Sequence, residues 1–289
     1  QGLMGPYSQW RNYFGSLNAW EVLRSQRLLE LCGGLGLAWQ LAGYRRQAQI
    51  EEQIVRGCNG FLGRTKWDHA EIRKLNSSAP YWRVDEVLRK PFYAHRWCLE
   101  GVQTHSIIFT NAGAPRRGTE DLLAAVGKLR DNYPDIKLYL GGRISERSGY
   151  GRFLRRRIRK MELASAVELL GYMGAEQMVQ RLLRSHVFVL ASYIENSPNS
   201  LCEAMLVGMP CIATDSGGTP DLFEDGVSGL RVRPGDPDGL AARIDAVFQS
   251  DKLAAGLGAR AAQTAADRHH PERIVQQLLR AYRQVAGDG

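Results

Sequence analysis

Short apolar runs alternate with helical segments from about residue 106 onward, and this alternation constrains the fold more than any other feature of the chain. Each run spans four or five residues, and a turn separates it from the next helical segment. The runs lie at residues 106–110, 136–140, 167–170, 187–190, 211–214 and 229–232. Apolar strands separated by helices are typical of an α/β protein with a parallel, doubly wound sheet covered on both faces. Ligands bind at the carboxyl ends of such strands, so we expect the functional site in those loops.

The first 105 residues predict half of a second α/β layer. Their pattern indicates helices over about 19–31 and 36–55, a strand at 60–63, a helix from about 67 and a strand near 81–84. A complete domain of this type needs roughly 150 residues. The chain also begins at Gln1 and enters a turn over 2–6, as if a strand had been completed upstream. We therefore expect a fragment of a longer protein.

Composition narrows the class of protein. The 289 residues are 44% hydrophobic and 24% charged, which is typical of a globular chain. No uncharged apolar run approaches the roughly 18 residues that a membrane span needs, and no signal peptide is indicated, so we expect a cytoplasmic protein. The net charge of +8 favours anionic partners such as nucleotide phosphates, anionic lipids or nucleic acid. Five widely spaced cysteines without a CxxC pair indicate reduced thiols rather than disulfides or a zinc site.

Two glutamates flank the start of a predicted helix. Glu195 lies in the loop after a strand, and Glu203 lies in the first turn of the helix that begins at 198–200. The free amides and the dipole of a helix N-terminus bind phosphate, and two nearby carboxylates would hold the hydroxyls of a nucleotide sugar. Alternatively, Ser200 and Glu203 form a capping box. That alternative explains neither Glu195 nor the glycine pair at 217–218.

The same stretch, with Gly208–Pro210 and Ala213–Pro220 behind it, resembles the E-x7-E signature of family 4 (group 1) glycosyltransferases. The resemblance covers about 106–283 and, more weakly, the residues before it. It implies a GT-B type fold with two Rossmann-like domains, of which the N-terminal one is incomplete here. It also implies that Glu195 contacts the donor sugar and acts in catalysis, and that Glu203 binds the nucleotide ribose. The phosphate-binding amides would be those of Asn199, Ser200 and Leu201.

The predicted domains follow from this resemblance. Residues 1–105 would form a partial N-terminal domain on the acceptor side, and residues 106–270 the domain that binds the nucleotide sugar. Residues 271–289 would form a helix that crosses back toward the first domain, with apolar residues at helical spacing.

A basic turn at Pro115–Gly118 is the second matching motif. The family usually has Lys-Gly here, so the resemblance implies that Arg117 neutralises the donor diphosphate; arginine binds phosphate bidentately. A solvated turn is the alternative. The Gly-Arg pair expected just upstream is replaced by residues 110–113, and Arg116 or Arg64 would supply the missing cation.

Three further segments allow two interpretations each. The loop Gly171, Tyr172 and Met173 resembles the segment that flanks the nucleobase in relatives, although Gly171 would also permit a tight turn and Tyr172 would also pack. The basic run Arg152–Lys160 would rest on anionic lipid or form a solvated helix face; its apolar stripe favours the latter. His269 and His270 precede the proline that starts the last helix, so we expect them to be exposed and expect no metal site.

The sequence therefore predicts a retaining glycosyltransferase that moves a sugar from a nucleotide-diphosphate donor to an acceptor hydroxyl on a glycan, a lipid-linked sugar or a small molecule. The resemblance implies that no metal or other cofactor is needed. The protein would be cytoplasmic, with peripheral contact at the inner face of an anionic membrane as a further option. A non-catalytic nucleotide-sugar-binding partner, an epimerase-like or phosphorylase-like enzyme and a nucleic-acid-binding protein are the alternatives; the last lacks every familiar reader motif.

Overall fold

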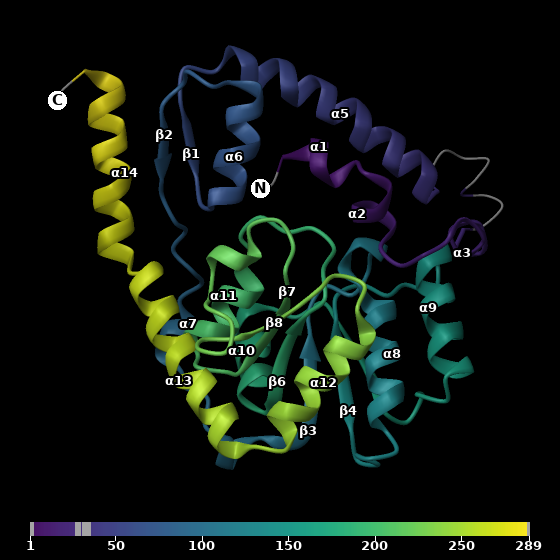
Figure 1. The fold of residues 1–289 in the computed structure, drawn as a ribbon. Helices are drawn as coiled ribbons and strands as arrows, with labels where there is room; N and C mark the ends of the chain where they lie inside the picture. The colour runs from purple at the N-terminus through teal and green to yellow at the C-terminus, as the bar shows by residue number, and fades with distance from the viewer. Residues whose placement is uncertain (1–2, 27–29, 31–35, 288–289) are drawn as a thin grey trace.

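Six parallel strands form the central sheet of the computed structural model, which describes residues 3–26, 30 and 36–287 (Figure 1). The strands are β3 (Gln103–Phe109), β4 (Lys137–Gly141), β5 (Val167–Gly171), β6 (Ser185–Leu190), β7 (Cys211–Thr214) and β8 (Leu230–Val232). Their order across the sheet is β5-β4-β3-β6-β7-β8, and every neighbouring pair is parallel. The order reverses between β3 and β6, which is the topological switch point where ligands bind in such sheets.

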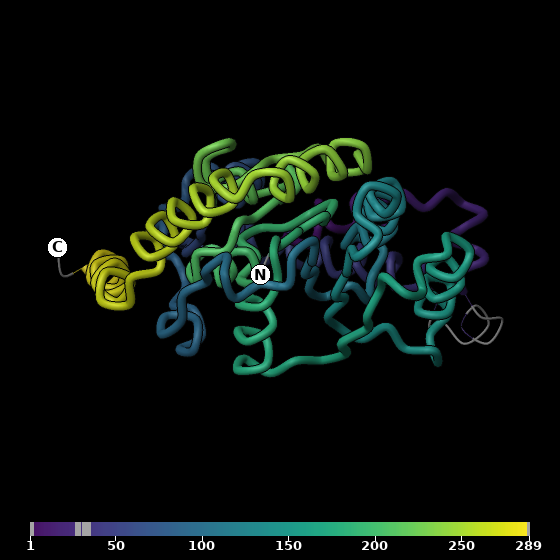
Figure 2. The backbone as a smooth tube through the Cα atoms, turned by 90° about the horizontal axis from the view of Figure 1, so that it is seen from below, coloured from purple at the N-terminus to yellow at the C-terminus, as the bar shows by residue number. Residues whose placement is uncertain are grey.

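Helices cover both faces of this sheet, as the alternation predicts (Figure 2). They are α8 (Thr119–Leu129), α9 (Gly149–Lys160), α10 (Ala175–Leu183), α11 (Asn199–Leu206), α12 (Pro237–Phe248) and α13 (Asp251–Arg268). All residues of β6 and β7 are buried, which explains the continuous apolar runs 187–190 and 211–213 within them. β3 begins three residues earlier than predicted, because Gln103 and Thr104 are exposed and carry no apolar signal.

The part of the chain before β3, called the upstream part below, contains a second, two-stranded parallel sheet. Strands β1 (Phe61–Gly63) and β2 (Tyr81–Arg83) pair in register, with α6 (Lys66–Leu75) between them in the chain. Helix α5 (Leu37–Gly57) lies above them in Figure 1. The expected helix over 19–31 is observed as α3 (Ala19–Arg24), and residues 27–29 and 31 lie outside the described residues.

Two short helices near the N-terminus were not predicted. Residues 2–6 were interpreted as a turn after an upstream strand, but the chain forms one helical turn, α1 (Met4–Tyr7), followed by α2 (Trp10–Phe14). Both are too short for a periodic apolar pattern, so the sequence gives little local signal for them. Tyr13 and Phe14 of α2 are fully buried, and tertiary packing therefore stabilises this segment.

A long connection leads from β2 to β3 through α7 (Pro91–Ala94) and a 3₁₀ turn, η1 (Leu99–Gly101). At the other end of the chain, α14 (Pro271–Ala286) starts with proline at its first position, as predicted, and runs beside β2 (Figure 1). The indole of Trp82 in β2 donates a hydrogen bond to Gln284 in this helix. The predicted apolar stripe of α14 is only partly buried: Ile274 is buried, whereas Tyr282 is about half exposed.

Candidate functional site

The two loops at the switch point bring Arg117 and Glu195 into contact. Arg117 ends the 3₁₀ turn η2 (Pro115–Arg117) after β3, and Glu195 lies in the loop after β6. The guanidinium of Arg117 forms an ion pair with the carboxylate of Glu195, which also accepts a hydrogen bond from the Ser192 hydroxyl at 2.9 Å. Glu195 is 6% exposed, so this carboxylate is buried against its partners.

Gly118 makes this contact possible. Its φ is +70°, and a Cβ atom there would lie 2.1 Å from the carbonyl oxygen of Ala191. Only glycine combines the left-handed conformation with so close an approach. The amide of Tyr193 donates to the carbonyl of Arg116 at 2.8 Å, which fixes the basic turn on the loop that carries Glu195. The Arg-Arg-Gly motif is therefore not a freely solvated turn.

The glycine pair after β7 supports Glu195 from its other side. Gly217 has a φ of +55°, and a Cβ atom there would lie 1.9 Å from the Glu195 carbonyl oxygen. The amide of Gly218 donates to the same oxygen at 2.9 Å. This loop holds the backbone of Glu195, which gives the glycine pair a structural role.

A cavity of about 370 Å³ opens beside the Arg117–Glu195 pair. Three arginines line it: Arg117, its neighbour Arg116, and Arg64 from the upstream part. Burial, together with the charge of Arg116, lowers the pKa of Arg117 to about 10, so an anion in the cavity would be bound favourably. The remaining lining residues are Met4, Tyr7, Tyr44, Asn196 and Ser197. The structure thus brings both predicted substitutes for the missing cation, Arg64 and Arg116, to one place.

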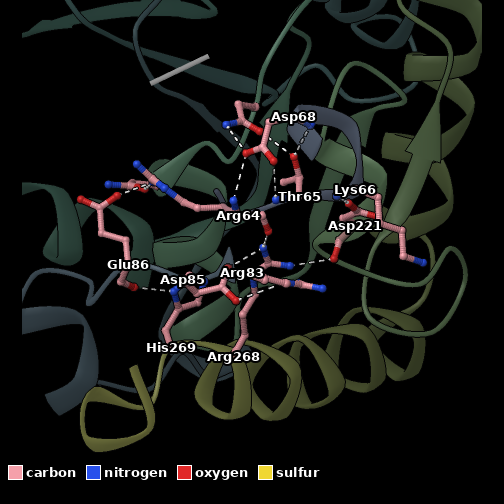
Figure 3. A network of polar contacts seen from close by, with 12 residues as sticks. Arg64, Thr65, Lys66, Asp68, Arg83, Asp85, Glu86, Asp221, Arg268 and His269 are labelled. Carbon is pink, nitrogen blue, oxygen red and sulfur yellow. Dashed lines mark hydrogen bonds and ion pairs between the residues drawn. The ribbon is translucent and has the colours of Figure 1, made fainter. Parts of the chain in front are cut away.

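Arg64 reaches the cavity from the end of β1. Its guanidinium forms an ion pair with Glu86 (Figure 3). It also donates a long hydrogen bond of 3.4 Å to the side-chain oxygen of Asn199, at the start of α11. Asn196 is held in the same way by the upstream part: the Thr65 hydroxyl donates to its side-chain oxygen at 2.6 Å, and its amide nitrogen donates to Asp68 at 2.9 Å. These bonds place the upstream part directly on the loop of Glu195.

Arg268 and His269 complete this junction from the end of α13 (Figure 3). Arg268 forms a buried ion pair of 2.6 Å with Asp85 and donates to the carbonyl of Arg64 at 2.6 Å. The prediction that His269 is exposed is wrong: the residue is 1% exposed, and its Nδ1 atom lies 2.7 Å from the carbonyl oxygen of Glu86. Burial lowers the pKa of His269. His270, its neighbour, is exposed.

The start of α11 excludes the capping box. Pro198 is the N-cap, and no side chain caps the helix; Ser200 lies two residues after the N-cap, inside the helix. Of the three predicted phosphate-binding amides, that of Leu201 already donates to the carbonyl of Pro198 at 3.0 Å. The amides of Asn199 and Ser200 are the first two of the helix, and they have no acceptor within it.

Glu203 is held by a residue that the sequence did not indicate. Both carboxylate oxygens accept hydrogen bonds from the Arg89 guanidinium, each at 2.7 Å, and the Glu203 side chain is 3% exposed. Glu203 does not line the cavity that contains Glu195. Glu195 thus lies in the loop before α11 and Glu203 lies within α11, and each glutamate is paired with an arginine. Arg89 is 114 residues away in sequence and belongs to no motif, so only the fold identifies it.

The predicted nucleobase loop turns at Gly171, whose φ is +69°. Tyr172 is 79% exposed, so the interpretation that it packs in the core is wrong. The side chain of Met173 lies against Gly141 at the end of β4. The hydrogen bonds with Glu203 raise the pKa of Arg89, and Tyr172 adds a smaller contribution in the same direction.

The basic helix α9 has the predicted apolar stripe, with Leu154 and Ile158 buried. Arg157 pairs with Glu21 of α3 at 3.0 Å. Arg156, Arg159 and Lys160 are exposed. Within the described ranges, no helix has the length and apolar character to cross a membrane, and no group of three or more metal-binding His, Cys, Asp or Glu side chains gathers.

Solved structures share this architecture. Sucrose-phosphate synthase from Thermosynechococcus elongatus superposes with a TM-score of 0.74 at 20% identity, over 83% of this chain and 62% of that one. HepE from Anabaena, solved in complex with UDP, gives a TM-score of 0.71 at 19% identity, over 78% of this chain and 64% of that one. This similarity confirms the predicted α/β fold of GT-B type.

Several curated proteins with similar sequences are named as glycosyltransferases. The phosphatidyl-myo-inositol mannosyltransferase of Mycolicibacterium smegmatis is 29% identical over 182 residues, which are 61% of this chain and 44% of that protein. The D-inositol 3-phosphate glycosyltransferase of Streptomyces scabiei is 27% identical over 227 residues, 73% of this chain and 51% of that protein. The chain thus spans about half the length of the curated relatives it matches. The family model described as "Glycosyl transferases group 1" matches residues 101–264. Because this match covers more than half of the chain, the protein belongs to the glycosyl transferases group 1 family.

Proposed function

We propose that the protein transfers a sugar from a nucleoside-diphosphate donor to an acceptor hydroxyl. The observation that carries this proposal is the cavity where Arg64, Arg116 and Arg117 surround one side of the buried Glu195 carboxylate. A diphosphate and a sugar need adjoining cationic and hydrogen-bond-accepting groups, and this cavity provides both.

The Arg117–Glu195 ion pair suggests how the donor would bind. The diphosphate would take over the guanidinium of Arg117, and the freed carboxylate of Glu195 would accept hydrogen bonds from the sugar hydroxyls. As the glycosidic bond breaks, negative charge grows on the departing diphosphate. Arginines fixed in a partly buried site stabilise that charge without the need to reorganise. The amides of Asn199 and Ser200 would add two further donors at the helix N-terminus.

The finer form of the proposal is a retaining, hexosyltransferase-like reaction that needs no metal. It rests on the family resemblance. The names of the relatives guide the choice of substrates: HepE is also solved with UDP-glucose, and two relatives are named for inositol-containing acceptors. UDP-glucose and inositol phosphates are therefore the first donor and acceptors to test, and glycans and lipid-linked sugars follow.

A non-catalytic nucleotide-sugar-binding partner is the second candidate. Each of the two predicted donor-binding carboxylates already has an arginine partner, and a nucleotide sugar could replace these partners without any transfer step. Donor hydrolysis or transfer separates the two candidates, because a pure binder shows neither.

Peripheral contact with an anionic membrane is a further part of the proposal. The exposed cations Arg156, Arg159 and Lys160 of α9 lie on a helix that an ion pair joins to α3, where Trp20 is 71% exposed. Exposed aromatic and basic side chains together favour the surface of an anionic bilayer. Sedimentation with phosphatidylglycerol vesicles, compared with phosphatidylcholine vesicles, tests this part independently of activity.

The experiment that tests the main proposal is a screen of nucleotide sugars by thermal shift, followed by product analysis with the stabilising donor. We expect stabilisation by at least one nucleotide sugar, and loss of that stabilisation in Arg117→Ala. The matched control is Arg156→Ala, which removes an exposed arginine outside the cavity. Equal stabilisation of the parent and Arg117→Ala would contradict the proposed site.

A further inference from the structure

Arg89 covers the carboxylate of Glu203. Its Nε and Nη2 atoms each donate to one carboxylate oxygen at 2.7 Å, which is the bidentate geometry that arginine and carboxylate favour. The Glu203 side chain is 3% exposed, whereas the Arg89 side chain is 46% exposed. The guanidinium therefore occupies hydrogen-bonding positions on both oxygens of Glu203 that a ligand would need.

The surroundings of Arg89 allow it to leave this position. It lies in the connection between β2 and α7, outside any helix or strand. Its guanidinium lies over the ring of Phe92, with 4.9 Å from Cζ to the ring centroid. Because the side chain is half exposed, water would solvate the guanidinium if it moved away. Glu203 has no such option, since a buried carboxylate needs a hydrogen-bonding partner.

We propose that the guanidinium of Arg89 occupies the position on Glu203 where the ribose of the donor binds. Arg89 thereby determines how strongly the site prefers a ribose that carries both hydroxyls. This inference rests on the proposed function, which assigns the ribose to Glu203. A nucleotide enters by exchanging two N–H···O bonds from Arg89 for two O–H···O bonds from the 2′- and 3′-hydroxyls. The buried carboxylate is hydrogen-bonded both before and after the exchange, and the guanidinium turns into water.

The exchange makes a prediction about affinity. In the parent protein, part of the ribose binding energy is used to displace Arg89, because Glu203 is free to accept the ribose in only a fraction of the molecules. Removing the guanidinium removes this competition. A nucleotide that lacks both ribose hydroxyls gains nothing from the removal, since it cannot satisfy Glu203.

The test is calorimetric titration of the full chain. ADP, GDP and UDP are titrated first, and the tightest is then compared with its 2′,3′-dideoxy analogue. In Arg89→Ala we expect the ribonucleotide to bind about tenfold more tightly, and the dideoxy analogue to bind as it does to the parent. Arg89→Lys keeps the charge without the bidentate geometry and should give a smaller increase; it also keeps the test usable if Arg89→Ala does not fold. Lys90→Ala is the matched control, because it removes the neighbouring exposed cation and should change neither affinity.

Glu203→Gln separates this inference from the proposed function. Suppose that Glu203→Gln reduces the preference for the ribonucleotide over its dideoxy analogue, but that Arg89→Ala and Arg89→Lys leave the ribonucleotide affinity unchanged or lower it. The assignment of the ribose to Glu203 then stands, and the role proposed for Arg89 is wrong. If Glu203→Gln leaves the preference unchanged, the ribose assignment fails and the inference fails with it. A gain for the ribonucleotide alone in the Arg89 variants supports the inference.

Discussion

At the scale of single residues, two arginine–carboxylate pairs dominate the candidate site. Arg117 pairs with Glu195 and Arg89 pairs with Glu203, so each buried carboxylate has a cationic partner before any donor binds. Breaking such a pair without a replacement is costly, because it leaves a buried charge unpaired. A donor with a diphosphate and several hydroxyls supplies replacements for both partners.

Arg117→Ala should weaken the binding of a nucleoside diphosphate far more than that of the free nucleoside. A charge-assisted hydrogen bond contributes about 1.5–3 kcal/mol, which corresponds to a loss of roughly 10- to 100-fold in affinity. Calorimetry with UDP and uridine, or the corresponding pair for the preferred base, measures both. Equal losses for the two ligands would show that Arg117 does not contact the diphosphate.

The two glutamates should differ in their kinetic effect. Glu195→Ala should mainly lower kcat, because its carboxylate would contact the sugar at the reacting centre. Glu203→Ala should mainly raise the donor KM, because the ribose is remote from the bond that breaks. Steady-state kinetics with the donor found in the screen measures both constants. Parental kcat and KM in both variants would contradict the site assignment.

Glu120 should make stability depend on pH. Burial raises the pKa of this fully buried carboxyl to about 8, from an ordinary value of about 4.5. Between these values the folded chain keeps a proton that the unfolded chain releases, so the contribution of Glu120 is complete below pH 4.5 and is lost as the pH rises toward 8. The parent should therefore lose a few kcal/mol of its free energy of unfolding between pH 4.5 and 8, whereas Glu120→Gln should not show this loss. The difference in free energy of unfolding, variant minus parent, should rise with pH. Chemical denaturation at several pH values measures it, and a flat difference would contradict the buried carboxyl.

At the scale of elements, glycines fix the loops of the site. Gly217→Ala should destabilise the protein by about 1–3 kcal/mol and lower activity, because a Cβ atom would meet the carbonyl oxygen of Glu195. Gly226→Ala is the matched control: its φ of +75° brings the same conformational strain, but no atom lies within 4 Å of its Cβ position. Denaturation and turnover should separate the variants, with activity lost only at Gly217. Equal activity would show that the loop does not hold Glu195.

Local patterns predict the elements of the central sheet well. Its strands carry the apolar runs themselves, so their positions could be predicted from sequence, apart from the polar starts of β3 and β6. The same holds for Arg117 and Glu195, because the strands before them end at one edge of the sheet. The helices α1 and α2 could not be predicted, since their stability comes from distant contacts rather than from periodicity.

At the scale of the whole molecule, the upstream part completes the site. Arg64, Tyr7 and Tyr44 line the cavity, and Arg89 binds the carboxylate of Glu203. These contacts join residues more than 100 positions apart, so neither spacing nor composition indicates them. The sequence motifs therefore identified Arg117, Glu195 and Arg64 as candidate residues, but they gave no indication of Arg89, Tyr7 or Tyr44.

Arg268→Ala should weaken this assembly. Arg268 is 8% exposed and pairs with Asp85 at 2.6 Å, so its loss leaves this buried carboxylate with only the longer 3.6 Å ion pair to Arg83 and should cost up to about 3–5 kcal/mol of stability. Arg273→Ala, at an exposed position on α14, should cost little. Thermal unfolding measures both. If Arg268→Ala matches the control, the ion pair does not hold the upstream part to the sheet.

The measurement that tests the central claim most directly is a crystal structure of the protein with its tightest-binding nucleotide sugar. The account predicts that the diphosphate lies on Arg117 and Arg116, with the sugar hydroxyls on Glu195 and the Arg117–Glu195 pair opened. A nucleotide bound away from this cavity, with that ion pair intact, would contradict it.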